Sequence, residues 1–154
     1  MLSRNALTTA LLLALAVSPA LGQEQKITAS DLPAAVKRTA DQQSKGATVR
    51  GYARETEHGR VQYEVELLVA GKSRDVTIGE DGRVLEVEQQ LDFDSLPRAV
   101  RAALTKRAGT GTISWVESLS KGGKLVAYEA GVLTAGQRAQ IQVGPDGRAL
   151  AHEE

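Results

Sequence analysis

Two segments of the chain repeat apolar residues at the three- and four-residue spacing of an amphipathic helix. The first stripe consists of Leu32, Ala35, Val36, Thr39 and Ala40, and the second of Leu96, Ala99, Val100, Ala103 and Leu104. Pro33 and Pro97 stand in the first turn, where a missing N–H costs little, and Gly46 and Gly109 end the segments. The pattern predicts two helices, each with one face packed against the rest of the fold.

Alternating apolar and polar residues follow each helix and predict antiparallel strands joined by tight turns. In the first half, the turn signals are Glu57-His58-Gly59, Ala70-Gly71 and Asp81-Gly82. Pairing outward from these turns predicts the following partners: Ala53 and Tyr63, Val49 and Leu67, Tyr63 and Ile78, Val65 and Val76, Ile78 and Leu85, and Val76 and Val87. All of these apolar residues then share one face, which a slip of one residue would invert.

The second half gives the same result from the turn signals Lys121-Gly122, Ala135-Gly136 and Asp146-Gly147. The predicted partners are Trp115 and Tyr128, Ile113 and Ala130, Tyr128 and Val143, Ala130 and Ile141, and Val143 and Leu150. Each half is therefore predicted to be one helix followed by a four-stranded antiparallel meander, with the helix covering the apolar face.

The two halves also repeat each other in sequence. Residues 63–88 and 128–153 share 11 identities in 26 positions, and Asp31-Leu32-Pro33 aligns with Ser95-Leu96-Pro97. Similarity with the turns in step favours a duplicated structural unit. We therefore expect an α+β fold of two tandem repeats, over residues 23–90 and 91–154, that share a core or a continuous sheet because one repeat alone is small.

Residues 1–22 have the charged, apolar and small-residue order of a secretory signal peptide. Arg4 precedes the apolar run Ala6–Val17, and Ala20-Leu21-Gly22 precedes a cut ahead of Gln23. The alternative is a retained anchor, but the run is shorter than the ~20 residues that span a bilayer. Cysteine is absent, which disfavours lipidation. We expect a periplasmic or secreted protein with no stable membrane anchor after cleavage.

The composition excludes several classes of function. Lys plus Arg and Asp plus Glu are both 19, and removal of Arg4 leaves 18 against 19, a net charge of −1. A nearly neutral chain argues against non-specific nucleic-acid binding. The absence of cysteine excludes disulfides and thiol nucleophiles. His58 at a predicted hairpin tip and His152, predicted opposite Ile141, offer no rigid general base, and no ligand spacing suits zinc. We therefore expect no catalytic residue, metal site, cofactor or enzymatic activity.

Acidic residues leave a cation-binding role open. Asp92-Phe93-Asp94-Ser95 lacks the EF-hand spacing and is interpreted as a linker with a helix cap rather than a calcium loop. The predicted outer face of the first half carries Arg50, Tyr52, Arg54, Gln62, Glu64, Glu66, Asp75, Glu86 and Glu88. That face could hold a cation or a basic partner, or it could be a solvated sheet face on which the arginines balance the acids.

The corresponding face of the second half is far less charged. It is predicted to carry Val116, Leu125, Ala127, Gly131, Leu133, Gln140, Gln142, Ala149 and Ala151. Exposed apolar surface often marks a partner site, so the candidate binding residues are Tyr52, Val116, Leu125 and Leu133. The alternatives are that Gln23–Ala29, the other half or a second copy covers this face, or that the assignment of faces is reversed here.

The repeated motifs resemble the PepSY-like domain family. They comprise Leu-Pro at each helix start, then Tyr-Glu-x-x-x-Leu, a glycine turn, and Asp-Gly-Arg-x-Leu. In fold, a tandem pair is similar to the beta-lactamase-inhibitor-protein-like architecture. The resemblance implies an exported bacterial protein, and some relatives occur in protease propeptides, where the module is proposed to inhibit the peptidase. Tyr63, Tyr128, Asp81 and Asp146 match family positions and are interpreted as core and turn residues.

Taken together, the sequence predicts a non-enzymatic exported protein-binding module, with inhibition of a peptidase or hydrolase as one form of that function. The partner would be another exported protein. The alternative is a periplasmic small-ligand or cation-binding protein that uses the acidic sheet face.

Overall fold

The computed structural model describes residues 24–154, apart from residues 58 and 153. The signal peptide expected over residues 1–22 and the hairpin-tip His58 therefore lie outside the described residues.

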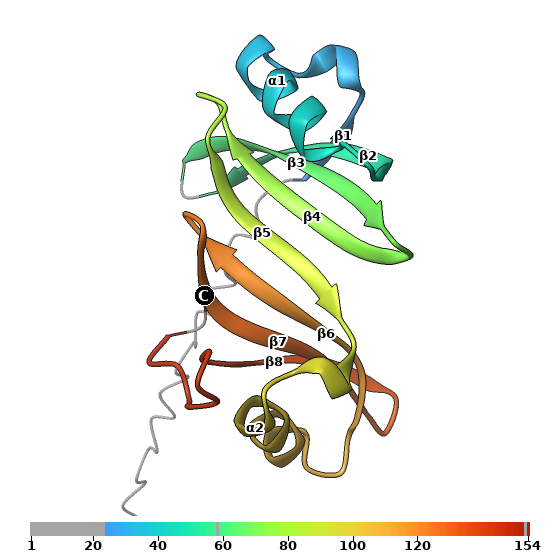
Figure 1. The fold of residues 1–154 in the computed structure, drawn as a ribbon, viewed down its shortest axis with the longest axis vertical. Coiled ribbons are helices and arrows are strands. Elements are labelled where there is room, and N and C mark those ends of the chain that lie inside the picture. The colour runs from blue at the N-terminus through green and yellow to red at the C-terminus, as the bar shows by residue number, and fades with distance from the viewer. Residues whose placement is uncertain (1–23, 58, 153) are drawn as a thin grey trace, which may run out of the picture.

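The described residues form two α-helices and one antiparallel sheet of eight strands in sequential order (Figure 1). The helices are α1 (Ala34–Gln43) and α2 (Arg98–Ala108), and short 3₁₀ turns at Ala29–Asp31 and Phe93–Ser95 lead into them. The strands are β1 (Gln25–Ile27), β2 (Thr48–Glu57), β3 (Arg60–Val69), β4 (Lys72–Gly79), β5 (Val84–Leu91), β6 (Thr112–Lys121), β7 (Lys124–Thr134) and β8 (Gln137–Val143). The predicted α+β class is thus confirmed.

Each helix begins directly after a proline that occupies the N-cap position. Pro33 and Pro97 both have extended backbone there, and each carbonyl accepts the first helical hydrogen bond, from Lys37 and Arg101. The sequence pattern predicted the prolines in the first turn of each helix, whereas the structure places them one residue before it.

Two hydrophobic cores lie under the two helices. Leu32, Val36 and Ala40 of the first core pack with Tyr63, Val65, Leu67, Val76 and Ile78. In the second core, Leu96, Val100 and Leu104 pack with Val116, Ala130 and Val143. The apolar stripes of the sequence thus become the buried faces of α1 and α2.

Strand β5 shows that both helices cover the same side of the sheet. Val87 packs against the first core, and Leu91 packs against the second. Residues four apart on a strand point to the same side. Figure 1 shows α1 and α2 at opposite ends of the molecule, with the sheet running between them.

The register between β3 and β4 is the predicted one, with Tyr63 opposite Ile78 and Val65 opposite Val76. Between β4 and β5, Val76 pairs with Val87 as predicted, but Ile78 pairs with Val84 instead of Leu85. The turn has three residues rather than two, since Gly79 N–H bonds to the Arg83 carbonyl oxygen at 2.9 Å. A bulge then leaves Leu85 exposed.

The predicted pairing of Tyr63 with Ala53 is wrong, because Tyr63 lies opposite Arg54. Glu57 pairs directly with Arg60, so this loop is one residue shorter than predicted. A bulge between Val49 and Gly51 then restores the predicted pairing of Val49 with Leu67.

The register between β6 and β7 also differs from the prediction. Lys121 pairs with Lys124 around a turn at Gly122-Gly123, so Trp115 lies opposite Gly131, Ile113 opposite Val132, and Tyr128 opposite Ser118. The predicted Trp115–Tyr128 and Ile113–Ala130 pairs are therefore wrong. Between β7 and β8, the structure confirms Tyr128 opposite Val143 and Ala130 opposite Ile141.

The strands are not divided as predicted. β1, which the sequence pattern did not reveal, pairs with β2, and the described residues after Val143 form no strand. Val143 is therefore not paired with Leu150, and His152 is exposed rather than placed opposite Ile141. Ala149 stands where the first half has Val84, a residue of higher β propensity.

Both Asp-Gly turns pack closely on a helix. A Cβ on Gly82 would lie 2.9 Å from the Ala35 carbonyl oxygen, and one on Gly147 would lie 2.7 Å from that of Ala99. Thr39 also donates a hydrogen bond of 2.7 Å to the Gly82 carbonyl oxygen. The glycine of each turn is thus required both by its positive φ and by the nearby helix backbone.

We expect Gly147→Ala to destabilise the fold more than Gly136→Ala. Both positions have φ near +80°, so both substitutions cost about 1 kcal/mol of backbone strain. Only at Gly147 would the new Cβ also collide with a helix carbonyl, whereas Gly136 has no atom within 4 Å. Urea unfolding should show a total loss of roughly 3 kcal/mol for Gly147→Ala. Equal losses for the two variants would contradict this packing.

Candidate functional site

The side of the sheet away from α1 and α2 carries no helix among the described residues. We call this side the open face. It is defined by alternate strand residues whose side chains point away from the two cores, together with the backbone of Gly131: Glu64, Glu66, Asp75, Glu86, Glu88, Trp115, Glu117, Leu119, Glu129 and Leu133.

Carboxylates lie directly opposite one another on neighbouring strands of this face. Glu66 faces Asp75 across β3 and β4, and Asp75 faces Glu88 across β4 and β5. Further along the sheet, Glu117 faces Glu129 across β6 and β7. Like charges placed directly opposite each other destabilise a sheet. The open face therefore concentrates negative charge at a cost to the fold.

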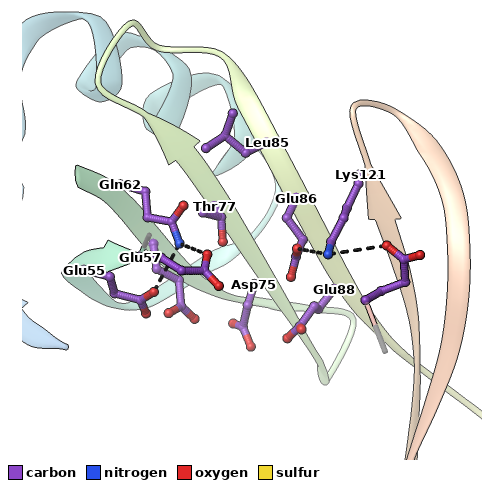
Figure 2. Close-up of a pocket in the computed structure, with 11 residues that line it drawn as sticks. Glu55, Glu57, Gln62, Asp75, Thr77, Leu85, Glu86, Glu88 and Lys121 are labelled. Atoms are coloured by element: carbon purple, nitrogen blue, oxygen red, sulfur yellow. Dashed lines mark hydrogen bonds and ion pairs between the residues drawn. The ribbon is translucent and has the colours of Figure 1, made fainter. Parts of the chain in front are cut away.

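The acidic end of the face forms a hollow of about 400 Å³. Its acidic lining consists of Glu55, Glu57, Glu64, Asp75, Glu86, Glu88 and Glu154. Figure 2 shows the labelled acids projecting from the strands on one side of the sheet, with Lys121 reaching in among them. Lys121 Nζ lies 3.7 Å from Glu86 Oε2 and 3.6 Å from Glu154 Oε2.

Two carboxyl groups in the hollow have strongly perturbed acidities. Burial raises the pKa of Glu64 to about 8, helped by a hydrogen bond with Glu55 and by the charge of Asp75. Burial also raises the pKa of Glu88 to about 7, with further contributions from Glu117 and Glu86. Both groups therefore hold a proton over part of the neutral pH range.

Three other carboxyl groups on the open face are raised in the same direction. Burial and the charge of Glu66 raise the pKa of Asp75, while Arg50 opposes this effect. Burial raises the pKa of Glu86, and the ammonium of Lys121 opposes it. Burial and the charge of Asp75 raise the pKa of Glu117. The perturbation thus extends across the face from β3 to β6.

The far end of the open face is aromatic and apolar. Trp115 lies against Gly131 so closely that a Cβ on this glycine would be 2.2 Å from the indole Nε1. Leu133, two residues further along β7, has 44% of its surface exposed. A second hollow is lined there by Trp115, Gly131 and Leu133 together with Arg138 and Gln140 of β8.

The C-terminal residues reach across the middle of the open face. Glu154 N–H donates to Gln142 Oε1 at 2.8 Å, and the side chain of Glu154 pairs with Lys121. Leu119 and Ala127 lie between Gln142 and Lys121 and are buried.

The structure separates the four predicted binding residues into two groups. Leu133 is 44% exposed and lies on the open face as predicted. Leu125 is 40% exposed but lies on the helix side, because it pairs with Ser120, which in turn pairs with the core-facing Val87.

Tyr52 and Val116 are not on the open face as predicted, because each pairs with and packs among core residues. The β2–β3 loop is one residue shorter than predicted, which places Tyr52 on the helix side. Val116 lies on the helix side because a bulge between Leu119 and Ser120 shifts the pairing of β6 with β7.

Trp115 is the residue of this face that the sequence pattern missed. Its predicted pairing with Tyr128 placed it toward the helix, whereas the structure places it opposite Gly131. The available signal was the lack of a side chain at Gly131, which lets a large ring lie on the neighbouring strand.

The loop before α2 connects the two halves, but it does not supply the predicted side-chain cap, because Pro97 occupies the N-cap of α2. Ser95 Oγ donates to the Asp92 carbonyl oxygen at 2.6 Å, Lys72 pairs with Asp92, and Arg101 Nη1 lies 3.5 Å from Asp94 Oδ1. Across residues 24–154, leaving out 58 and 153, no group of three or more histidine or acidic residues is placed to hold a metal ion. The helices of this part of the chain are also too short or too polar to cross a membrane.

Several solved structures share this fold. A BLIP-like protein from Bacteroides fragilis has a TM-score of 0.57 and 19% identity over 78% of this chain and 83% of its own. A proposed periplasmic protein from Bacteroides eggerthii has a TM-score of 0.63 and 18% identity over 77% and 85%. A DUF2874 family protein from Bacteroides ovatus has a TM-score of 0.61 and 18% identity over 77% and 84%.

These similarities confirm the expected BLIP-like architecture and, at such identities, concern the fold alone. No protein-family model matches the chain, and no curated protein matches it either.

We expect the melting temperature to fall as the pH rises from about 5 to about 9. The raised pKa values of Glu64 and Glu88 mean that the folded state holds protons that the unfolded chain has released above its ordinary pKa of 4.5. The free energy of unfolding therefore decreases through this window. Glu64→Gln should raise the melting temperature at the alkaline end by a few degrees and flatten the slope.

The matched control is Glu80→Gln, at the exposed β4–β5 turn. It should leave the slope of melting temperature against pH unchanged in differential scanning calorimetry. A melting temperature that rises over this range, or an equal effect of the two variants, would show that the open face does not hold these protons.

Proposed function

We propose that this chain is an exported, non-enzymatic binding protein that holds a protein partner on the open face of its sheet. The observation that carries this proposal is the placement of both helices on one side of the sheet. The half-buried Trp115 and the exposed Leu133 therefore lie on the side that no helix covers. Large apolar side chains grouped on a solvent-facing surface favour a partner site.

Export is supported by the signal-like order of residues 1–22 and by the shared fold with a proposed periplasmic protein. We further propose that residues 23–90 and 91–154 are two PepSY-like repeats. Support comes from the sequence repeat, from one helix and one core in each half, and from the packing of each Asp-Gly turn on its own helix.

Inhibition of a peptidase or hydrolase is one form that this binding could take. The support is the fold shared with a BLIP-like protein and the resemblance to modules of protease propeptides. The mechanism would be steric, because an open sheet face and its hairpin tips can occupy a partner's cleft without any chemistry.

The non-enzymatic part of the proposal rests on how the titratable groups lie. His152 is exposed and outside any strand. Carboxyl groups with perturbed pKa values can also mark active sites. Glu64 and Glu88, however, project from a sheet face into a hollow that is lined mainly by other acids and is open to solvent. A general acid or base needs a substrate held beside it in a fixed pose.

The second candidate is a small-ligand or cation-binding protein, which the acidic hollow favours. The described residues offer no set of three ligands for a metal ion, so this candidate ranks below the first. A calcium titration separates the two, because a ligand that binds only the folded state must raise the melting temperature.

We expect a saturable partner to be captured from an exported-protein extract by the folded chain and lost with Leu133→Lys and with Trp115→Ala. Each change removes apolar contact area at the centre of the proposed interface and should weaken binding by at least about tenfold. Mass spectrometry identifies the partner, and circular dichroism checks the fold of each variant.

Val49→Lys is the matched control, since Val49 is 37% exposed but pairs with the core residue Leu67 on the helix side. Capture that survives both open-face changes, or that Val49→Lys removes equally, would place the interface elsewhere.

A further inference from the structure

The open face has two chemically different ends that adjoin each other. On β6, Trp115 stands two residues before Glu117, and on β7, Gly131 stands two residues after Glu129. Residues two apart on a strand point to the same side and are neighbours there. The indole thus borders the row that contains the Glu117–Glu129 pair.

We propose that the partner presents an extended segment rich in lysine and arginine, an inference that rests on the proposed function. This segment crosses the strands between Glu66 and Glu129 and places one cationic side chain beside Trp115.

Charge complementarity identifies this occupant. Glu66, Asp75 and Glu88 lie side by side on three consecutive strands. Glu117 and Glu129 lie on the next two strands in the adjacent row, because Glu88 pairs with Leu119 and Glu117 pairs with Gln90. Lysine or arginine side chains inserted between these carboxylates would replace repulsion with attraction. An acidic or purely apolar segment would gain nothing from the same surface and would have to desolvate it.

The dimensions suit a short extended chain. Strands β3 to β7 are consecutive in the sheet, so their carboxylates span about 19 Å at roughly 4.8 Å per strand. An extended chain covers about 3.3 Å per residue, so about six residues cross this distance.

The aromatic end explains why the cation would be part of a protein rather than a free metal ion. Trp115 lies against Gly131 and is half-buried, so the ring is held in place next to Glu117. A guanidinium or ammonium beside an indole is stabilised by the ring electrons, and its hydrocarbon stem adds apolar contact. The exposed Leu133 extends this apolar contact.

The acidities of the open face agree with this occupant. Burial and neighbouring acids raise the pKa of Glu88 to about 7 and that of Glu64 to about 8. The groups that face them are Glu55, Glu66, Asp75, Glu86, Glu117 and Glu129. The cations near this group of acids are Lys121, beside Glu86, and Arg50, which acts on Asp75. An arriving cation would oppose the repulsion that, after burial, contributes to the raised pKa values.

The test uses a fluorescent peptide of about six lysines, with a glutamate peptide of the same length as its counterpart. Peptide anisotropy gives the affinity, and the emission of Trp115, the chain's only tryptophan, reports on the site. We expect the lysine peptide to bind and shift the Trp115 emission. We also expect its affinity to fall at least about tenfold between roughly 0.05 M and 0.5 M salt.

The decisive variant is Glu88→Gln combined with Glu117→Gln. Removing two acids should weaken lysine-peptide binding about tenfold. It should also raise the melting temperature, because repulsion is relieved, so weaker binding cannot be attributed to unfolding. The matched control, Glu24→Gln combined with Glu80→Gln, makes the same change of net charge at two exposed positions outside the rows and should bind within about twofold of the original chain.

Equal binding to the two double variants, binding that salt does not affect, or equal binding of the glutamate peptide would overturn the inference. A metal-ion result would overturn it as well. In that case calcium chloride at matched ionic strength would raise the melting temperature, and the lysine peptide would leave the Trp115 emission unchanged. If a captured partner is lost with Trp115→Ala but not with the paired glutamine changes, the proposed function stands and only its basic partner is rejected.

Discussion

The placement of both helices on one side of a continuous sheet is the constraint on which the rest of this structure depends. Strand β5 belongs to both cores through Val87 and Leu91, so neither half can turn its apolar face away from the other. The opposite side of the sheet carries no helix among the described residues, so much of it must be compatible with water. Carboxylates meet that requirement over β3 to β6. They repel one another because so many side chains of the same charge lie close together on one face.

Turn length and bulges work together to keep that division of faces. The tight turn between Glu57 and Arg60 would leave the outer part of β2 out of phase, and the bulge between Val49 and Gly51 corrects it. The three-residue turn before Arg83 is likewise followed by a bulge at the start of β5. Bulges also bend and twist a sheet locally. The same irregularities that keep apolar residues under the helices therefore contribute to the curvature of the open face.

Much of this fold could be predicted from the sequence because its signals are local. The helices, the α+β class, the antiparallel order and the pairing of Val65 with Val76 follow from alternation and turn residues. The candidate site was harder to predict, since assigning a residue to a face requires both the loop length and the position of every bulge. A loop one residue shorter than predicted changes the face of Tyr52, and the bulge between Leu119 and Ser120 changes the faces of Val116 and Trp115. Strand β1 has only three residues, too few to show a period.

The open face links stability to occupancy. Burial, helped by neighbouring acids, makes the folded chain hold protons on Glu64 and Glu88, and the desolvation and repulsion of the ionised groups oppose folding at alkaline pH. A positively charged partner relieves both effects, so its binding would release protons and stabilise the fold at the same time. An apolar partner at Trp115 and Leu133 alone would stabilise the fold without releasing protons. The number of protons released on binding therefore measures how far a partner extends from the aromatic end into the acidic rows.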